Sequence, residues 1–219
     1  MTVKLNKVRG QAADGNAAGV IGPISMKLYP GLTGLVGANG AGKSILIGLL
    51  AQVWKPTAGN IVYEMNGLPL NAFEVRQYLG YVPQEIAIYS DMTVGAYLQY
   101  IAGLKCLDKW AVAATIRKMS EIFDIAAIRD ERLGQLSVGQ QRLVVIAQAL
   151  LGNPAFLFLD EPFENLDIRQ RRDLLGMLSE AAQHAVVLVS SHITEEMNRE
   201  YDTIIKLVNG SIEEPAAEF

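Results

Sequence analysis

Three glycines, one lysine and one serine stand close together in the segment Gly37-Ala38-Asn39-Gly40-Ala41-Gly42-Lys43-Ser44. The spacing matches the pattern G-x-x-x-x-G-K-[ST], in which a loop winds closely round an anion and points its N–H groups at phosphate oxygens. In this pattern Lys43 is expected to reach the β- and γ-phosphates of a nucleoside triphosphate, and the Ser44 hydroxyl to bind Mg²⁺. The residues expected to contact the nucleotide are Gly37, Asn39, Gly40, Ala41, Gly42, Lys43 and Ser44.

The residues on both sides of this loop favour a phosphate site over a chance glycine-rich turn. Residues 32–36 are mostly apolar and fit a buried strand. Residues 45–54 are predicted to form a helix whose positive N-terminal end faces the phosphates. A strand before the loop and a helix after it are the context that the motif needs, so the sequence predicts a nucleotide-binding loop.

Two neighbouring carboxylates follow a second apolar stretch. Residues 156–159 read as a buried strand, and Asp160 and Glu161 come directly after it. Such a pair is often part of a solvated loop or a helix N-cap. Downstream of a phosphate loop, however, an acidic residue at the end of a strand helps to hold Mg²⁺. Asp160 is predicted to take that role, and Glu161 to polarise a water molecule for attack on the γ-phosphate.

A third segment, Leu136-Ser137-Val138-Gly139-Gln140, is predicted to open a helix shortly before the acidic strand. Ser137 is a good N-cap, and Gly139 leaves backbone N–H groups open near the helix end. Taken alone, these five residues describe an ordinary capped helix. Their position between the phosphate loop and the acidic pair favours a role in nucleotide binding.

In this order, the phosphate loop, Gln84, residues 136–140, the acidic strand and His192 resemble the ATP-binding cassette (ABC) ATPase family over nearly the whole chain. The resemblance implies that two nucleotide-binding domains pack head to tail, with ATP between the phosphate loop of one and residues 136–140, the signature, of the other. Ser137 and Gly139 would then contact the γ-phosphate of ATP held by the second domain.

The resemblance also assigns roles to single residues. Gln84 resembles the glutamine that touches Mg²⁺ and the attacking water and moves with a transmembrane partner. Glu161 resembles the catalytic base, and Asp167 the aspartate that communicates across the dimer. His192 resembles the histidine that hydrogen-bonds the γ-phosphate and positions the water. The implied catalytic set is Glu161, His192 and Gln84, and the implied Mg²⁺ ligands are Ser44, Gln84 and Asp160.

Three departures from the family pattern stand out. Val138 occupies a signature position where glycine is usual, and its branched side chain narrows the approach to the second domain's nucleotide, so reduced activity is expected. No aromatic residue precedes Tyr29 to stack on adenine, which leaves Arg9 as a candidate for that contact. Ile45 replaces a polar residue that is common after the Mg²⁺ serine.

The elements that must position these residues alternate between strand and helix. Strands are predicted at 2–8, 24–28, 32–36, 61–64, 79–82, 155–159, 186–190 and 203–208, with a hairpin turn at Asn66-Gly67. Helices are predicted within 93–123, with Asp108 as an N-cap, and also after Ser137, over 166–182 and after His192. The predicted fold is an α/β P-loop NTPase with a mostly parallel central sheet, an antiparallel N-terminal β-subdomain and an inserted α-helical subdomain.

Length and composition fit one such domain. The chain has 219 residues, half of them hydrophobic. We expect residues 1–219 to form a single ABC ATPase domain, with an ATP-binding core at about 1–90 and 151–219 and a helical subdomain at about 91–150. The net charge of −4 argues against electrostatically driven binding to nucleic acid. The single cysteine, Cys106, excludes a disulfide framework.

These observations predict a motor subunit that binds ATP and Mg²⁺ and drives an ABC transmembrane subunit on a separate chain through ATP-dependent dimerisation. No apolar run approaches the roughly 18–20 residues of a membrane span, so the chain is expected in the cytoplasm, peripheral on the inner face of the membrane through that partner. The second domain of the dimer is either a copy of the chain or a different cassette. The segment 81–84 with 86–98 is similar to short exporter-type cassettes.

Two alternatives stay open. One is a degenerate or regulatory cassette that binds ATP with little turnover, which Val138 and the missing aromatic residue favour and intact Lys43, Glu161 and His192 oppose. The other is a soluble non-transport ABC ATPase. Such proteins usually carry a second cassette, a long coiled coil or a basic insert, and none is evident here.

Overall fold

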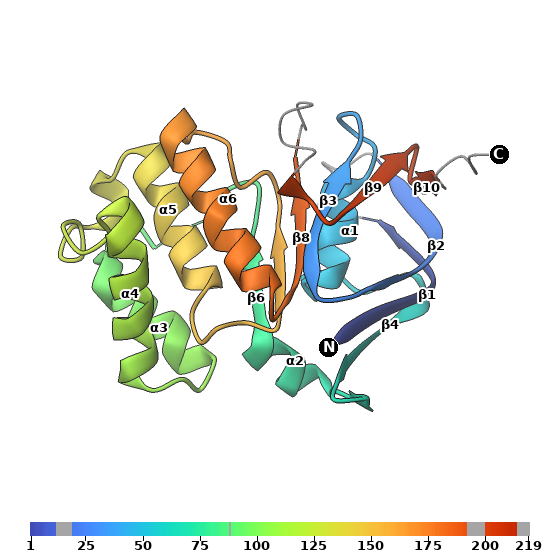
Figure 1. Ribbon diagram of the computed structural model, residues 1–219, viewed down its shortest axis with the longest axis horizontal. Helices are drawn as coiled ribbons and strands as arrows, with labels where there is room; N and C mark the ends of the chain where they lie inside the picture. Colours follow the sequence, from blue (N-terminus) through green and yellow to red (C-terminus); the bar gives the residue numbers. More distant parts are fainter. Residues whose placement is uncertain (12–18, 88, 192–199, 214–219) are drawn as a thin grey trace.

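The computed structural model describes residues 1–11, 19–87, 89–191 and 200–213. The predicted catalytic residue His192 and the helix predicted after it lie outside these residues. Within the described residues, two sheets and the helices packed on them form the fold (Figure 1).

The smaller sheet is antiparallel and has the strand order β2-β1-β4-β5. Its strands are β1 (Thr2–Gln11), β2 (Val20–Leu28), β4 (Ala58–Met65) and β5 (Leu68–Pro69). Asn66 and Gly67 both have positive φ angles, of 54° and 79°, which is the geometry of the predicted hairpin turn. The antiparallel N-terminal part of the predicted fold is therefore confirmed.

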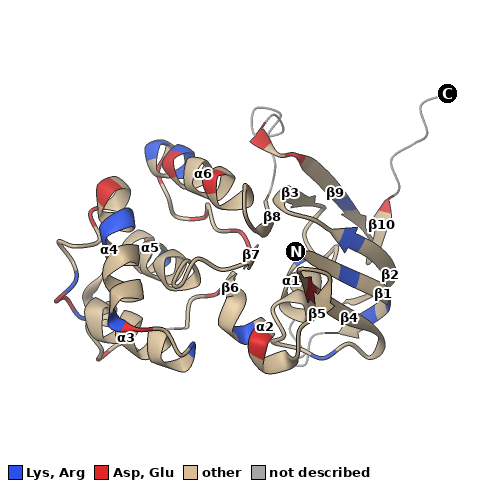
Figure 2. Ribbon diagram, turned by 60° about the horizontal axis from the view of Figure 1, so that its bottom comes forward, with Lys and Arg blue, Asp and Glu red and all other residues tan. Residues whose placement is uncertain are grey.

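The larger sheet has six strands in the order β10-β9-β3-β8-β7-β6, and all neighbours are parallel except β10 and β9. Its strands are β3 (Gly31–Val36), β6 (Leu79–Val82), β7 (Phe156–Leu159), β8 (Val186–Ser190), β9 (Thr203–Val208) and β10 (Ser211–Glu213). Strands β3, β7 and β8 carry no charged residue (Figure 2), because helices or the other sheet cover both of their faces.

Helix α1 (Lys43–Leu50) packs against both sheets, and its apolar side chains join those of β1, β2, β7 and β8 in one core cluster. A second cluster covers the other face of the larger sheet. Its helices are α3 (Val94–Leu104), α4 (Lys109–Phe123), α5 (Val138–Ala149) and α6 (Ile168–Ala182). A 3₁₀ turn, η1 (Leu133–Gln135), leads towards α5. Helices α3, α4 and α5 fall within residues 91–150. That these residues form a separate helical subdomain stays a prediction.

Several element boundaries differ from the predicted ones. Helix α1 begins at Lys43 and ends at Leu50 rather than spanning 45–54. Strands β1 and β2 extend beyond 2–8 and 24–28, because register shifts after Leu5 and Val8 interrupt the alternation that marks a strand in the sequence. Helix α2 (Ala72–Tyr78) and β10 were not predicted. The helix predicted from residue 166 begins at Ile168, with Asp167 as its N-cap.

Among the described residues, no helix combines the length and the apolar character needed to cross a bilayer.

Candidate functional site

The glycine-rich loop lies at the carboxyl end of β3 and leads into α1. Gly42 is the N-cap of α1 and has a φ of 103°. Residues other than glycine rarely adopt this left-handed backbone conformation. A Cβ atom at this position would also lie 2.3 Å from Ile21 Cγ2 in β2. The first N–H groups of α1 have no intrahelical partner, as in every helix, and they are available to an anion.

Lys43 is 7% exposed and points back along the loop. Its Nζ donates a hydrogen bond to the Gly37 carbonyl oxygen at 2.9 Å and lies 3.5 Å from Glu161 Oε1. Lys43, predicted to bind phosphate, and Glu161, predicted to be the catalytic base, are therefore neighbours. An ammonium group held this way can meet a phosphate placed over the loop.

Asp160 and Glu161 are both buried and follow β7, next to the end of β8. Glu161 has a φ of 46°, which is unusual for a residue with a side chain. Ser190, the last residue of β8 and 0% exposed, joins the two. Its Oγ donates to Asp160 Oδ1 at 2.6 Å and accepts from the Glu161 N–H at 2.8 Å. Ser190 was not predicted as a site residue, although it stands two residues before His192 at the end of a predicted strand.

Gln84 lies in the loop after β6, residues 83–85, across from α1. The Ser44 hydroxyl is 3.5 Å from Gln84 Oε1. Gln84, Asp160 and Glu161 line one cleft of about 640 Å³ together with most of the glycine-rich loop, namely Ala38, Asn39, Gly40, Gly42, Lys43 and Ser44. Glu164, Trp54 and Tyr81 also contribute, whereas Gly37 and Ala41 of the loop do not line it. Burial and the negative charge of Asp160 raise the pKa of Tyr81 to about 12. Trp54 and Tyr81 had not been predicted as site residues.

The oxygen atoms in this cleft suit magnesium. Ser44, Gln84 and Asp160 present a hydroxyl, an amide and a carboxylate oxygen, which are the hard donors that Mg²⁺ prefers. Within the described part of the chain, no three histidine, cysteine, aspartate or glutamate side chains group into a metal site. Mg²⁺ in such a cleft would take its remaining ligands from nucleotide phosphates and water, which is its usual behaviour.

The signature residues lie elsewhere. Ser137 caps α5: its Oγ accepts from the Gln140 N–H at 3.3 Å, and Gln140 Oε1 accepts from the Ser137 N–H at 2.9 Å. A Cβ at Gly139 would come within 2.9 Å of the Asn165 carbonyl oxygen. Val138 is 56% exposed. Neither Ser137 nor Gly139 lines the cleft around Lys43.

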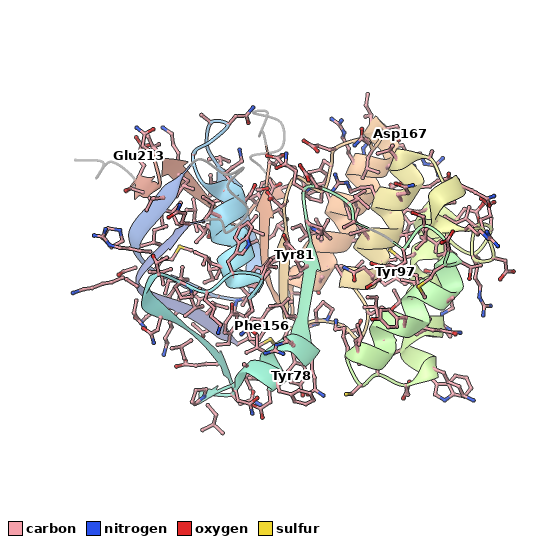
Figure 3. The ribbon with its side chains drawn as sticks, turned by 180° about the vertical axis from the view of Figure 1, so that it is seen from behind. Tyr78, Tyr81, Tyr97, Phe156, Asp167 and Glu213 are labelled. Atoms are coloured by element: carbon pink, nitrogen blue, oxygen red, sulfur yellow. The ribbon has the colours of Figure 1, made fainter. Side chains whose placement is uncertain are left out.

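Two further candidates are also outside the cleft. Asp167 caps α6 by accepting from the Gln170 N–H at 2.8 Å, and it lies at the upper edge of the molecule in Figure 3. Arg9 is exposed on β1 and lines a different groove, with Asn6 and Lys7. The structure thus brings together the loop, Gln84, Asp160 and Glu161, and leaves Ser137, Gly139, Asp167 and Arg9 apart. The roles of these residues stay predictions.

Comparison with known proteins gives one family. Residues 21–164 match the family model described as ABC transporter. The ABC transporter ATP-binding protein NatA of Bacillus subtilis is 30% identical over 194 residues, which are 86% of this chain and 78% of NatA. The uncharacterized ABC transporter ATP-binding protein YxlF of the same organism is 35% identical over 178 residues, 81% of this chain and 59% of YxlF.

The chain thus spans little more than half of YxlF, and it spans 11% of the phospholipid-transporting ATPase ABCA3 of Mus musculus, to which it is 30% identical. Among solved structures, an ATP-binding subunit of an ABC transporter superposes with a TM-score of 0.85 at 24% identity, over 98% of this chain and 89% of that one. That likeness shows the fold. Together with the family match and the relatives, it leads to one conclusion: the chain belongs to the ABC transporter family, as an ATP-binding cassette.

Proposed function

We propose that the chain hydrolyses ATP and that this hydrolysis drives a transmembrane partner on a separate chain. One observation carries the proposal most directly: Lys43 Nζ and Glu161 Oε1, both buried, are 3.5 Å apart in a cleft that also holds Ser44, Gln84 and Asp160. A cation for the transferred phosphoryl group and a base for water therefore face the same space.

In the proposed reaction Ser44, Gln84 and Asp160 hold Mg²⁺, which when bound neutralises charge on the β- and γ-phosphates. The glycine-rich loop and Lys43 hold the phosphates in place through N–H groups and the ammonium. Water attacks the γ-phosphorus, the bond to the bridging β–γ oxygen breaks, and the proton of the water passes to Glu161. His192, which lies outside the described residues, is proposed to orient that water on the strength of the family resemblance.

A second cassette is proposed to complete the site. Ser137 and Gly139 are absent from the cleft of their own chain, yet they stand at the N-terminal end of α5, where N–H groups favour an anion. Head-to-tail pairing would bring these groups to the γ-phosphate held by another chain, with Asp167 at the contact between the two. One solved structure with the same fold, at a TM-score of 0.80 and 22% identity, is entitled a dimeric ABC transporter cassette.

The relatives support a role in transport. The sulfate/thiosulfate import ATP-binding protein CysA of Gloeobacter violaceus is 30% identical over 217 residues, 98% of this chain and 62% of CysA. ABCA3 is named for phospholipid transport. We place the chain on the cytoplasmic side of the membrane, bound there through its transmembrane partner.

The test is ATP turnover measured across protein concentration, beside Glu161→Gln. We expect the rate per molecule to rise with concentration and to fall by about 10²-fold or more in the variant, since general-base catalysis contributes 10²–10⁴-fold. Glu161→Gln is also expected to trap an ATP-bound dimer, visible by size-exclusion chromatography with light scattering. A variant that hydrolyses ATP like the parent would exclude Glu161 as the base.

The second candidate is a cassette that binds ATP with little turnover. The exposed Val138 in the signature favours it, because a branched side chain stands where a partner's nucleotide must approach. Firm ATP binding without turnover at any concentration of the parent would select this candidate.

A further inference from the structure

Arg142 lies in the second turn of α5, five residues after Ser137, and is 2% exposed. Its Nη1 donates to the Pro83 carbonyl oxygen and its Nη2 to the Gln84 carbonyl oxygen, both at 2.8 Å. Glu164 Oε2 lies 3.6 Å from Nη2. One side chain therefore joins the signature helix to the loop that carries Gln84 and to the segment after the acidic pair.

A buried guanidinium needs such partners. Burial lowers the pKa of Arg142, whereas the negative charges of Glu164 and Asp160 oppose that shift. Arginine stays charged in proteins, so its burial is tolerated only where hydrogen bonds replace water. The planar fork fits two successive carbonyl oxygens, a geometry that the single ammonium of lysine cannot reproduce. Nε has no hydrogen-bond partner among the described residues, so those two carbonyls are the main anchors of the group.

The helix that carries Arg142 is itself fixed. Most of its residues from 142 to 149 are buried in the core. Gln148 Nε2 donates to the Tyr81 carbonyl oxygen in β6 at 2.9 Å. At Gly80 a Cβ would lie 2.1 Å from the Ala149 carbonyl oxygen, so helix and strand are in close backbone contact. Arg142 thus holds residues 83 and 84 against a rigid support.

We propose that Arg142 is a positioning residue for Gln84: it fixes the backbone of residues 83 and 84 so that the Gln84 amide oxygen faces Ser44 in the metal-binding part of the cleft. This inference rests on the proposed function, since it concerns a residue that holds Mg²⁺ there. Because α5 begins directly after Ser137, the same side chain links the Gln84 loop of one chain to the signature that this chain offers to a second one.

The inference is tested by metal binding rather than by activity. All variants carry Glu161→Gln, so that ATP is not consumed, and Mn²⁺ binding to the ATP complex is measured by electron paramagnetic resonance. Arg142→Lys keeps the charge and removes the fork, and we expect it to weaken Mn²⁺ binding by about tenfold, the lower end for loss of a residue that orients a metal ligand. Arg117→Lys, an exposed arginine on α4, is the matched control and should bind Mn²⁺ like the parent.

A double-mutant cycle separates positioning from general destabilisation. If Arg142 acts through Gln84, then Arg142→Lys causes no further loss of Mn²⁺ binding in a chain that already carries Gln84→Ala. The inference would be overturned if Arg142→Lys weakened Mn²⁺ binding equally in chains with Gln84 and in chains with Gln84→Ala. It would also be overturned if Arg142→Lys weakened Mn²⁺ binding in neither. If Arg142→Lys does not fold, Arg142→Met replaces it under the same prediction, because a buried charge can often be replaced by an apolar side chain of similar volume.

The outcomes also separate this inference from the proposed function. A parent that binds no Mn²⁺ with ATP contradicts the proposed nucleotide and metal site itself. A parent that binds Mn²⁺ normally, with Gln84→Ala weakened and Arg142→Lys unchanged, leaves the site intact and refutes only the role of Arg142.

Discussion

At the scale of single residues, Ser190 shows how much of the cleft depends on a side chain that does not line it. Its hydroxyl uses both its donor and its acceptor capacity on the acidic pair, one to Asp160 and one to the backbone of Glu161. The second bond holds Glu161 at a positive φ, which a residue with a side chain adopts at a cost. The serine therefore fixes the direction of the Asp160 carboxylate and the backbone from which the Glu161 side chain projects.

Ser190→Ala is expected to lower the free energy of unfolding by about 1–3 kcal/mol, because it leaves buried polar groups of Asp160 and Glu161 unsatisfied. Urea unfolding measures the loss. Ser25 is the matched control: its Oγ also accepts from a backbone N–H, that of Lys7, but it is exposed, so water can replace it in Ser25→Ala. Similar losses in the two variants would contradict the importance of burial at Ser190.

Residues that belong to short motifs can be predicted from the sequence, whereas those that act across the sheet cannot. Lys43, Ser44, Asp160 and Glu161 are identified by their neighbours in the chain. Ser190 reaches Glu161 across 29 positions, and Arg142 reaches Pro83 across 59. Nothing in the local pattern around either residue specifies that contact, since it depends on which strands and helices become neighbours.

At the scale of elements, prediction succeeded where an apolar run is bounded by turn residues. Strands β3, β6, β7, β8 and β9 are of this kind. The start of α5 was predicted instead from its N-cap, Ser137. Helix α2 was missed because it spans seven residues with only Val75 buried, too short and too exposed for a helical stripe. Its one local signal is the capping box of Asn71 and Glu74.

Lys105 joins two elements in a way that depends on pH. It is the C-cap of α3, and its Nζ donates to the Leu151 carbonyl oxygen, just after α5, at 2.9 Å. Burial lowers the pKa of Lys105 to about 8. The unfolded chain, with the ordinary value of 10.5, then binds more protons than the folded chain between these two values. The stability contributed by this group is therefore lowest below pH 8 and rises towards pH 10.5.

Lys105→Met removes this titration. As the pH rises from 7.5 to 10, the free energy of unfolding of the parent is expected to increase by about 2 kcal/mol relative to that of Lys105→Met. Urea unfolding at both pH values gives the difference, and effects common to both chains cancel. Parallel pH profiles for the parent and Lys105→Met would show that folding leaves the pKa of Lys105 at its ordinary value.

At the scale of the whole molecule, the proposed site is divided between two chains: one chain supplies the cleft around Lys43, and the other supplies the signature, residues 136–140. Val138 belongs to the signature. It is exposed at the start of α5, apart from the cleft around Lys43. A side chain there cannot affect the nucleotide of its own chain directly. In the proposed dimer, an effect of Val138 on turnover is therefore expected to pass through association with a second cassette.

Val138→Gly is expected to raise turnover several-fold at a fixed protein concentration without changing ATP affinity at dilutions where single chains prevail. The physical reason is a closer approach of the signature N–H groups to the second chain's nucleotide. Val138→Ala should give an intermediate rate, which makes the series a measure of side-chain size. An unchanged or lower rate in Val138→Gly would refute the steric explanation.

The strand order of the larger sheet sets when this molecule can bind its ligand during synthesis. Strand β3, which carries the phosphate loop, is flanked by β8 and β9, so both of its neighbours come from residues 186–208. Contacts of such high sequence separation form late, and domains emerge from the ribosome N-terminal end first. The loop at residues 37–44 is thus synthesised long before the two strands that flank β3, and we expect the nucleotide site to form only once residues 186–208 have left the ribosome.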